Sequence, residues 1–163
     1  MALIVEVATD ADIPAIIASA EALVATDAGR YDADATDLGW AARTGPAYCQ
    51  ALLSSDDNLV LLARESGDDG ENGVVVGHLV ARLGGPSSVH PVRVAELESI
   101  HVYPDHRGRG VGERLVAEFL VWAGRKGADR ASVTAYAANA GALRFYQRHG
   151  FAPRSVVLDR DVA

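Results

Sequence analysis

The sequence predicts a three-layer α/β domain, in which a mixed and mostly antiparallel sheet carries helices on both faces. Three observations predict this fold class. The hydrophobic pattern gives the element order β-α-α-β-β-β-α-β-α-β. The three consecutive strands are joined by short loops and are therefore antiparallel, whereas the later strand–helix–strand crossover places two strands parallel. A chain of 163 residues, 49% of them hydrophobic, has the size and core of one domain, so we expect a single domain over residues 1–163.

Apolar periodicity and its interruptions predict the elements of the first part of the chain. An apolar strand at residues 3–8 ends in an N-cap cluster at residues 9–12. Apolar residues at spacings of three and four then predict a helix over residues 13–25. Residues 27–45 are acidic and aromatic and are interrupted by glycines, which is typical of a loop region. The proline that follows suits the first turn of a helix, so a second helix is expected over residues 46–54.

Three consecutive strands come next. They are expected over residues 59–64, 74–83 and 92–102. Residues 66–73 are rich in glycine and aspartate and have the composition of a hairpin loop, and residues 84–91 form a second loop.

Helices and strands alternate in the rest of the chain. An amphipathic helix is expected over residues 110–126 and a strand over residues 130–136. A further helix over residues 139–149 ends at a glycine, the usual left-handed stop. The apolar run at residues 151–158 predicts a last strand.

Charge is divided unevenly along the sequence. The chain carries a formal net charge of −7, with −11 over residues 1–104 and +4 over residues 105–150. The acidic total argues against a partner that is a nucleic acid or an anionic membrane, because such partners need a basic surface. The basic segment instead predicts an anionic small ligand on one side of the molecule.

Several classes of protein are excluded by what the sequence lacks. Its start shows no signal peptide, and no apolar run approaches the roughly 20 residues of a membrane helix. The single cysteine, Cys49, allows no intrachain disulfide, and the five histidines show no metal-ligand spacing. We therefore expect a cytoplasmic protein with no metal site and no membrane partner.

A segment rich in arginine and glycine lies between the third central strand and the helix after it. Glycines let the backbone approach a ligand closely, and the unpaired amides at a helix start attract anions, phosphate above all. No Lys-Ser/Thr pair follows, which excludes a Walker loop, and the third glycine of a dinucleotide fingerprint is missing. The segment reads Arg107-Gly108-Arg109-Gly110-Val111-Gly112.

Two motifs together resemble a known family. The segment at residues 107–112, which follows Ile100-His101-Val102-Tyr103-Pro104, resembles the acetyl-coenzyme A binding motif of the GNAT superfamily of N-acetyltransferases. Residues 139–151 resemble the second signature of the superfamily, N-x-x-A-x-x-x-Y-x-x-x-G-F. The resemblance covers nearly the whole chain and is sharpest over residues 94–151.

The resemblance implies that acetyl-coenzyme A is the co-substrate and suggests how it is held. Amides of residues 109–114 would bind its pyrophosphate, and the strand at residues 100–102 would bind its pantetheine arm. The amide near Val102 would polarise the thioester carbonyl, and a bulge is expected on this strand to let the cofactor enter. The cofactor-binding residues implied are Ile100, His101, Val102, Arg107, Gly108, Arg109, Gly110, Val111, Gly112, Glu113, Arg114, Asn139 and Ala142.

The resemblance also names a proton donor. Asn139, Ala142 and Tyr146 are spaced three and four apart and so lie on one face of their helix. The resemblance gives Tyr146 the task of protonating the departing thiolate of coenzyme A. A phenol with its ordinary pKa of roughly 10 is protonated at neutral pH and suits this task. The alternative is that Tyr146 is an aromatic residue of the core.

Two glutamates are candidates for the group that takes a proton from the incoming ammonium. Period-two alternation places Glu96 and Glu98 on the same face of their strand as Ile100 and Val102, with His101 on the opposite face in a structural role. Members of the superfamily carry proton-relay residues at these strand positions, and we favour Glu98 over Glu96. Water is an alternative, as is a solvent-facing strand on which neither glutamate is catalytic.

The acidic, aromatic loop is the candidate acceptor site, because GNAT enzymes commonly build the acceptor pocket between their first two helices. Acids and aromatics suit a cationic amine, so Tyr31, Asp32, Asp34 and Trp40 are the expected acceptor-binding residues. An ordinary solvated loop is the alternative.

The expected activity is acetyl transfer to a primary amine of a small molecule, by direct attack in a ternary complex. A peptide or protein N-terminal acetyltransferase and a non-catalytic acyl-coenzyme A sensor are the alternatives. Dimers are common in the superfamily, so a homodimer is an open expectation.

Overall fold

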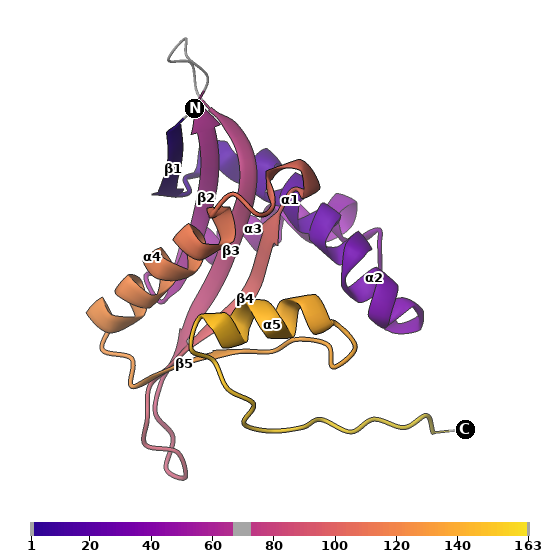
Figure 1. Ribbon diagram of the computed structural model, residues 1–163, viewed down its shortest axis with the longest axis vertical. Helices are drawn as coiled ribbons and strands as arrows, with labels where there is room; N and C mark the ends of the chain where they lie inside the picture. Colours follow the sequence, from indigo (N-terminus) through magenta and orange to yellow (C-terminus); the bar gives the residue numbers. More distant parts are fainter. Residues whose placement is uncertain (1, 67–72, 163) are drawn as a thin grey trace.

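A five-stranded sheet lies between two layers of helices in the computed structural model, which describes residues 2–66 and 73–162 (Figure 1). The strands are β1 (Ala2–Val7), β2 (Asn58–Ser66), β3 (Val74–Gly84), β4 (Val94–Val102) and β5 (Arg130–Val133). The helices are α1 (Ile13–Thr26), α2 (Ala28–Tyr31), α3 (Trp40–Leu53), α4 (Val111–Arg125) and α5 (Ala140–Arg148), with short 3₁₀ turns η1 (Asp10–Asp12), η2 (Ala33–Ala35) and η3 (Pro104–His106).

The sheet has the order β1-β2-β3-β4-β5. Neighbours are antiparallel from β1 to β4, and β5 runs parallel to β4. The predicted fold class, a mixed sheet with helices on both faces, is therefore confirmed.

Each face of the sheet has its own hydrophobic core. Behind the sheet in Figure 1, α1 and α3 cover one core, in which Ile16, Cys49 and Leu52 meet Leu62 and Val80 of the strands. In front, α4 covers the larger core, and α5 packs against its edge; its fully buried members include Leu79, Leu97, Leu115 and Phe119. Among the described residues, no helix is both long and apolar enough to cross a membrane.

The start of α1 is fastened to the sheet by a charged cluster. Thr9 and Asp12 form a capping box, with the Thr9 amide donating to Asp12 Oδ2 at 2.8 Å. Arg64 of β2 pairs with both Asp12 and Glu6. The backbone amide of Thr9 is the main group that holds the pKa of Asp12 below its ordinary value, and Arg64 adds to this effect. The N-cap cluster of the sequence therefore sets where α1 begins.

α3 begins at Trp40, six residues before the predicted helix start, and Pro46 lies inside it. The prediction was wrong because it treated the proline as a helix start. One face of α3 is buried at spacings of three and four, and Gly45 on this face lies 3.4 Å, measured from an ideal Cβ, from Ile17 of α1. Packing on α1 thus outweighs the lost proline hydrogen bond. The buried face consists of Ala41, Gly45, Cys49 and Leu52.

The last predicted strand is not formed. Residues 151–162 have no helix or strand, and the preceding strand, β5, ends at Val133 rather than at residue 136. A strand needs a hydrogen-bonding partner, and in this arrangement residues 151–158 run beside none. The predicted hairpin loop at residues 66–73 lies mostly outside the described residues.

β4 contains the expected bulge, at Glu98. Its pairing with β3 shifts between Ser99, which faces Val80, and Leu97, which faces Ala81, so Glu98 has no partner of its own. An extra residue of this kind bends the strand and reverses the alternation of side chains beyond it.

The bulge overturns the predicted faces of β4. Ile100 and Val102 pack into the core under α4, but Glu98 pairs with Arg82 at 2.8 Å beside Tyr48 of α3, on the other face. His101 also lies on the α1 side, the side that Glu98 occupies. Strict period-two alternation fails here because it counts the bulged residue as an ordinary one.

Candidate functional site

The turn between β4 and α4 forms a concave row of backbone amides. Gly108 and Gly110 have φ angles of 71° and 82°, the left-handed region that favours glycine. The amide of Arg114 donates to the carbonyl of Gly110 at 3.0 Å, so the amides before it stand at the open end of the helix. These amides and the helix dipole suit an anion such as a pyrophosphate.

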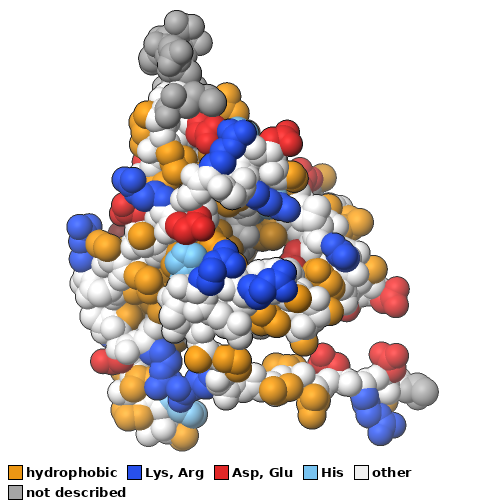
Figure 2. All heavy atoms as spheres, in the orientation of Figure 1, with side chains coloured by type: hydrophobic (Ala, Val, Ile, Leu, Met, Phe, Trp, Pro, Cys, Tyr) orange, Lys and Arg blue, Asp and Glu red, His pale blue; other side chains and the backbone are white. Residues whose placement is uncertain are grey.

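Two contacts hold this turn in place. The guanidinium Nε of Arg107 donates to the carbonyl of Val102 at 2.8 Å, which joins the turn to the end of β4. Gly112 is buried, and a Cβ at this position would lie 3.1 Å from the ring of Phe145, so the missing side chain lets α5 pack against the start of α4. Figure 2 shows a hollow in this face above α5, with Lys and Arg side chains along its border.

β4 and β5 separate next to the turn. Their pairing runs from Val94–Arg130 to Leu97–Val133 and then ends. β4 continues to Val102 with β3 on its other side, so its backbone from the bulge onward faces an opening. The predicted cofactor residues Ile100, His101 and Val102 lie in this stretch, beyond the end of the β4–β5 pairing and directly before the glycine turn. We call this edge of β4 the slot, because an extended ligand arm could pair with its backbone.

A cavity of about 540 Å³ lies on the other side of β4, between the sheet and helices α1 and α3. Its floor is apolar, with Ile16, Leu23, Val24, Leu52 and Val80. Its polar side chains include those of Asp32, Asp37, Tyr48, His78, Ser99 and Tyr136. The cavity could therefore hold a molecule with both an apolar and a cationic part.

Two of the four predicted acceptor residues line this cavity. Asp32 and Trp40 do, whereas Tyr31 stacks on Tyr136, a lining residue, at 5.6 Å between ring centroids. Asp34 belongs to η2 and is not among the lining residues, because this turn carries its side chain elsewhere. Burial, followed by the charge of Asp32, raises the pKa of Tyr136, so this phenol stays protonated beside the carboxylate.

Sequence reasoning missed several lining residues, including Tyr48, His78, Ser99 and Tyr136. For His78 a signal was available, since it is the one titratable side chain in the apolar stretch of residues 74–81. A polar residue at such a position indicates a partner across the core.

The candidate glutamates lie near the cavity but are not among its lining residues. Glu98 is held by Arg82, and Glu96 faces Arg82 across the β3–β4 pair. Burial raises the pKa of Tyr48, which lines the cavity, and the charge of Glu98 raises it further. Glu98 thus precedes Ser99 in the chain and lies close to Tyr48, although it does not itself line the cavity.

A buried chain of hydrogen bonds leads away from the cavity. Ser99 Oγ lies 3.2 Å from His78 Nε2, and His78 Nδ1 lies 2.6 Å from Ser19 Oγ. Ser19 Oγ lies 3.0 Å from His101 Nδ1. His78 and Ser19 have no exposed surface, and His101 is 4% exposed.

Both histidines in this series of hydrogen bonds, His78 and His101, are held neutral. Burial, followed by the charge that His101 would carry, lowers the pKa of His78 to about 3. Burial lowers the pKa of His101 to about 4, with the charge of Arg107 adding to the effect. Ser19 has one hydroxyl hydrogen for two ring nitrogens, so at least one imidazole must carry its hydrogen on Nδ1.

Tyr146 and Asn139 meet the end of α1. Burial, followed by the charge of Asp27, raises the pKa of Tyr146 to about 12, so its phenol is protonated at neutral pH. Asn139 Oδ1 accepts from the amide of Ala142 at 3.1 Å and caps α5, and its Nδ2 donates to Asp27 Oδ1 at 3.0 Å. Asp27 therefore acts on both predicted residues, a link that no local sequence pattern indicates.

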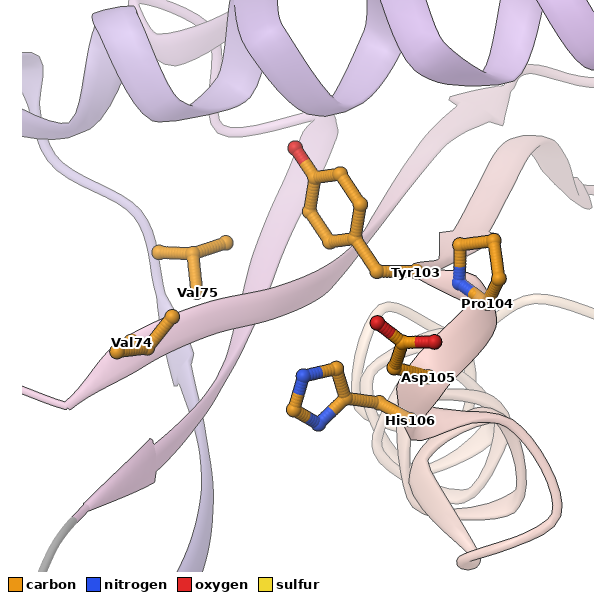
Figure 3. A pocket seen from close by; sticks show the side chains of 6 residues that line it. All are labelled: Val74, Val75, Tyr103, Pro104, Asp105 and His106. Atoms are coloured by element: carbon orange, nitrogen blue, oxygen red, sulfur yellow. The ribbon is translucent and has the colours of Figure 1, made fainter.

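A second, more open cavity of about 480 Å³ lies beyond the C-terminal end of β4 (Figure 3). The Tyr103 ring rises from the turn, and the Asp105 and His106 side chains project beside it from η3. His106 Nδ1 lies 2.9 Å from Glu65, and the Tyr103 amide donates to Val76 at 3.0 Å. These contacts fix the turn before the glycines, and no predicted site residue lines this cavity.

The sequence and the fold both resemble known acetyltransferases. The sequence model described as acetyltransferase (GNAT) family matches residues 29–151. An N-acetyltransferase of Methanocaldococcus jannaschii, described as uncharacterized, is 35% identical over 86 residues, which are 53% of this chain and 38% of the relative. An acetyl transferase of Oryza sativa subsp. japonica is 34% identical over 100 residues, 58% of this chain and 24% of the relative. The alignments thus span well under half of either relative.

Among solved structures, an aminoglycoside N-acetyltransferase in complex with coenzyme A has a similar fold. The TM-score is 0.72 at 21% sequence identity, over 99% of this chain and 96% of that one. The likeness extends over the whole chain, including the part outside the aligned segments of the two relatives.

Proposed function

This chain belongs to the acetyltransferase (GNAT) family. We propose that it is an acyltransferase, which transfers the acetyl group of acetyl-coenzyme A to a primary amine of a small molecule. The observation that carries the proposal is that β4 borders two candidate binding sites. The slot beside the glycine turn lies on one side of the strand, and the cavity lined by Ser99 and Tyr136 lies on the other.

The residues of the slot fit the co-substrate. The open amides at the start of α4 and the left-handed Gly108 and Gly110 suit its pyrophosphate, and the unpaired edge of β4 suits its amide-containing arm. When bound, this group supplies a thioester that an amine can attack. The chain contributes mainly by holding both partners close together.

Two proton movements accompany the transfer. Tyr146, protonated because of its raised pKa, is proposed to donate a proton to the leaving sulfur. Glu98 is proposed to take a proton from the ammonium through water, because its charge acts on Tyr48 and its neighbour Ser99 lines the cavity. Asp32 and the rings of Trp40 and Tyr136 are proposed to attract the cationic amine.

An amine panel tests the proposal. Coenzyme A should raise the unfolding free energy by about 2.7 kcal/mol at roughly 100 times its Kd. Thiol release from acetyl-coenzyme A should then rise with small amines from a panel of polyamines, aminoglycosides, arylalkylamines and amino acids. The aminoglycoside enzyme of similar fold supports including that class. Release with peptides alone would replace the proposed acceptor class by peptide N-termini, and no stabilisation by coenzyme A would refute the proposal.

Replacing Tyr146 by phenylalanine should lower turnover by roughly 100-fold, because the variant lacks the proton donor. The stabilisation by coenzyme A should remain, since the hydroxyl is not part of the proposed pyrophosphate site. Tyr103→Phe is the matched control, because it removes a phenol that lies in the second cavity. Steady-state thiol release measures both variants, and equal turnover of Tyr146→Phe and the unaltered protein would reject Tyr146 as the donor.

A further inference from the structure

The two threonines that border the acceptor cavity already have partners within the protein. The hydroxyl of Thr44 donates to the backbone carbonyl of Trp40 at 3.0 Å. The hydroxyl of Thr36 donates in the same way to the backbone carbonyl of Asp32. A hydroxyl has one hydrogen to donate, so neither threonine has it left for a ligand.

The polar groups on the strand side of the cavity are engaged as well. Ser99 Oγ lies 3.2 Å from His78 Nε2, and the other ring nitrogen of His78 lies 2.6 Å from Ser19 Oγ. Tyr48, which also lines the cavity, faces Arg82 of β3. A ligand with many hydroxyl groups would lose its hydrogen bonds to water on entry and would find few groups to replace them.

One of the two carboxylates of the cavity is already neutralised. Asp37 pairs with Arg43 and also accepts from the amide of Gly39 at 2.9 Å. Asp32 forms no ion pair in the part of the chain that the structure describes. It is therefore the carboxylate that remains for a cationic ligand, and it suits a single ammonium.

The Asp32 end of the cavity lies towards the proposed proton donor. After burial, the charges of Asp32 and Asp27 raise the pKa of Tyr136, so this ring lies close to both carboxylates. Asp27 in turn acts on Tyr146. An ammonium held between Asp32 and Tyr136 would therefore have its nitrogen on the side of the cavity where Tyr146 lies.

The rest of the cavity is an apolar space between α1 and α3. Its side chains come from both helices: Ile16, Ala20, Leu23 and Val24 of α1, and Cys49 and Leu52 of α3. The ring of Trp40 also borders it and meets Tyr48 edge-on, at 5.9 Å between ring centroids. The volume of about 540 Å³ is ordinary for a small-molecule site, so polarity rather than size selects the occupant.

Resting on the acetyl transfer proposed above, we propose that the acceptor is a primary amine with one positive charge and an apolar body, such as an arylalkylamine or an alkylamine. Its ammonium lies between Asp32 and Tyr136, and its body lies between α1 and α3. A second ammonium would be buried among apolar side chains without a carboxylate, and the hydroxyls of a sugar would be left without partners. In the transfer, the amine nitrogen bonds to the acetyl carbon as the carbon–sulfur bond breaks. The ammonium gives up two protons in all, and the thiol and the solvent each gain one.

Two matched pairs of amines test this acceptor class. Hexylamine and hexamethylenediamine have the same length and differ by one ammonium, and phenethylamine is compared with the aminoglycoside neamine. Steady-state thiol release should give a kcat/KM roughly 100-fold higher for hexylamine than for the diamine, because the second ammonium has no partner in the cavity. Phenethylamine should exceed neamine by a similar factor.

The outcomes separate this proposal from the proposed function. If the diamine or neamine reacts as well as its partner or better, the apolar acceptor class is overturned, although acetyl transfer to small amines stands. If no amine releases thiol, the proposed function is refuted, and this proposal with it.

Removing the charge of Asp32 tests where the ammonium binds. Asp32→Asn keeps the shape of the side chain, so KM for phenethylamine should rise roughly tenfold at a similar kcat. Asp10→Asn is the matched control, because it removes the same charge from η1, which does not line the cavity, and it should leave KM unchanged. Stabilisation by coenzyme A should be equal in both variants, which shows that they fold. An unchanged KM in Asp32→Asn would overturn the proposed binding of the ammonium.

Adding a carboxylate tests why a second ammonium is rejected. Thr44 lines the cavity and is exposed, so Thr44→Glu supplies a second carboxylate without entering the core. The preference for hexylamine over the diamine should fall roughly tenfold. Ala42→Glu, exposed on the same helix but outside the cavity lining, should keep the preference of the unaltered protein. Equal preferences in the two variants would contradict the proposal, because the missing carboxylate would then not be the cause.

Discussion

Lowering the pH from 7 to 5 should reduce the unfolding free energy by about 4 kcal/mol, roughly half from each of the two buried histidines. The pKa of His78 is about 3 and that of His101 about 4 in the folded protein, against 6.5 for an ordinary histidine. Below pH 6.5 the unfolded chain binds protons that the folded protein does not. The contribution of the two neutral histidines to the unfolding free energy is therefore fully present above this pH. It is lost as the pH decreases towards the pKa values of the folded protein. Such a loss is comparable to the total stability of many domains.

Urea unfolding at several pH values measures this effect through the slope of the free energy against pH. His101→Asn removes one titrating group. The decrease in its unfolding free energy between pH 7 and pH 5 should therefore be only about 2 kcal/mol, even if the variant is less stable overall. Asp12, with its lowered pKa, loses its contribution only near and below its ordinary value of 3.8, outside this range. A slope of zero between pH 7 and 5 would contradict the burial of neutral histidines.

Replacing Gly77 by alanine should lower the unfolding free energy by about 3 kcal/mol. A Cβ at Gly77 would lie 2.5 Å from the carbonyl oxygen of His101, closer than van der Waals contact allows. Both groups are backbone of paired strands, and β3 and β4 are further joined by the bond from Tyr103 to Val76, so neither can move aside cheaply.

Gly84→Ala is the matched control for this substitution. Gly84 belongs to the same strand, β3, and also pairs with β4. A Cβ at Gly84, however, would lie 3.6 Å from the carbonyl oxygen of Val94, an ordinary contact. The unfolding free energy of the Gly84→Ala variant should differ from that of the unaltered protein by no more than about 0.5 kcal/mol. Equal losses for the two variants, measured by chemical denaturation, would show that strand glycines matter here for flexibility rather than for close approach.

The sequence was sufficient for the features that depend on local chemistry. The glycine turn before α4 was predicted because such a turn needs only glycines and the helix start that follows. The order of the elements up to the helix at residues 139–149 also followed from local periodicity, and it sufficed for the mixed sheet.

Features that depend on distant contacts were missed. α3 runs through Pro46 because Gly45 and its neighbours pack on α1, which no local rule reports. The Ser19–His101 bond joins residues 82 apart in the chain, and the Asn139–Asp27 bond joins residues 112 apart. The last strand was predicted from its composition, but a strand also needs an available neighbour.

The bulge at Glu98 changes which residues of β4 face the core under α4. Before it, the odd-numbered Ala95 and Leu97 belong to the core under α4, and after it the even-numbered Ile100 and Val102 do. A strand of the same length without the bulge would keep the odd-numbered residues on the core side and turn His101 towards the wrong layer. The presence of the bulge is therefore under stronger constraint than the chemical nature of the side chain at position 98.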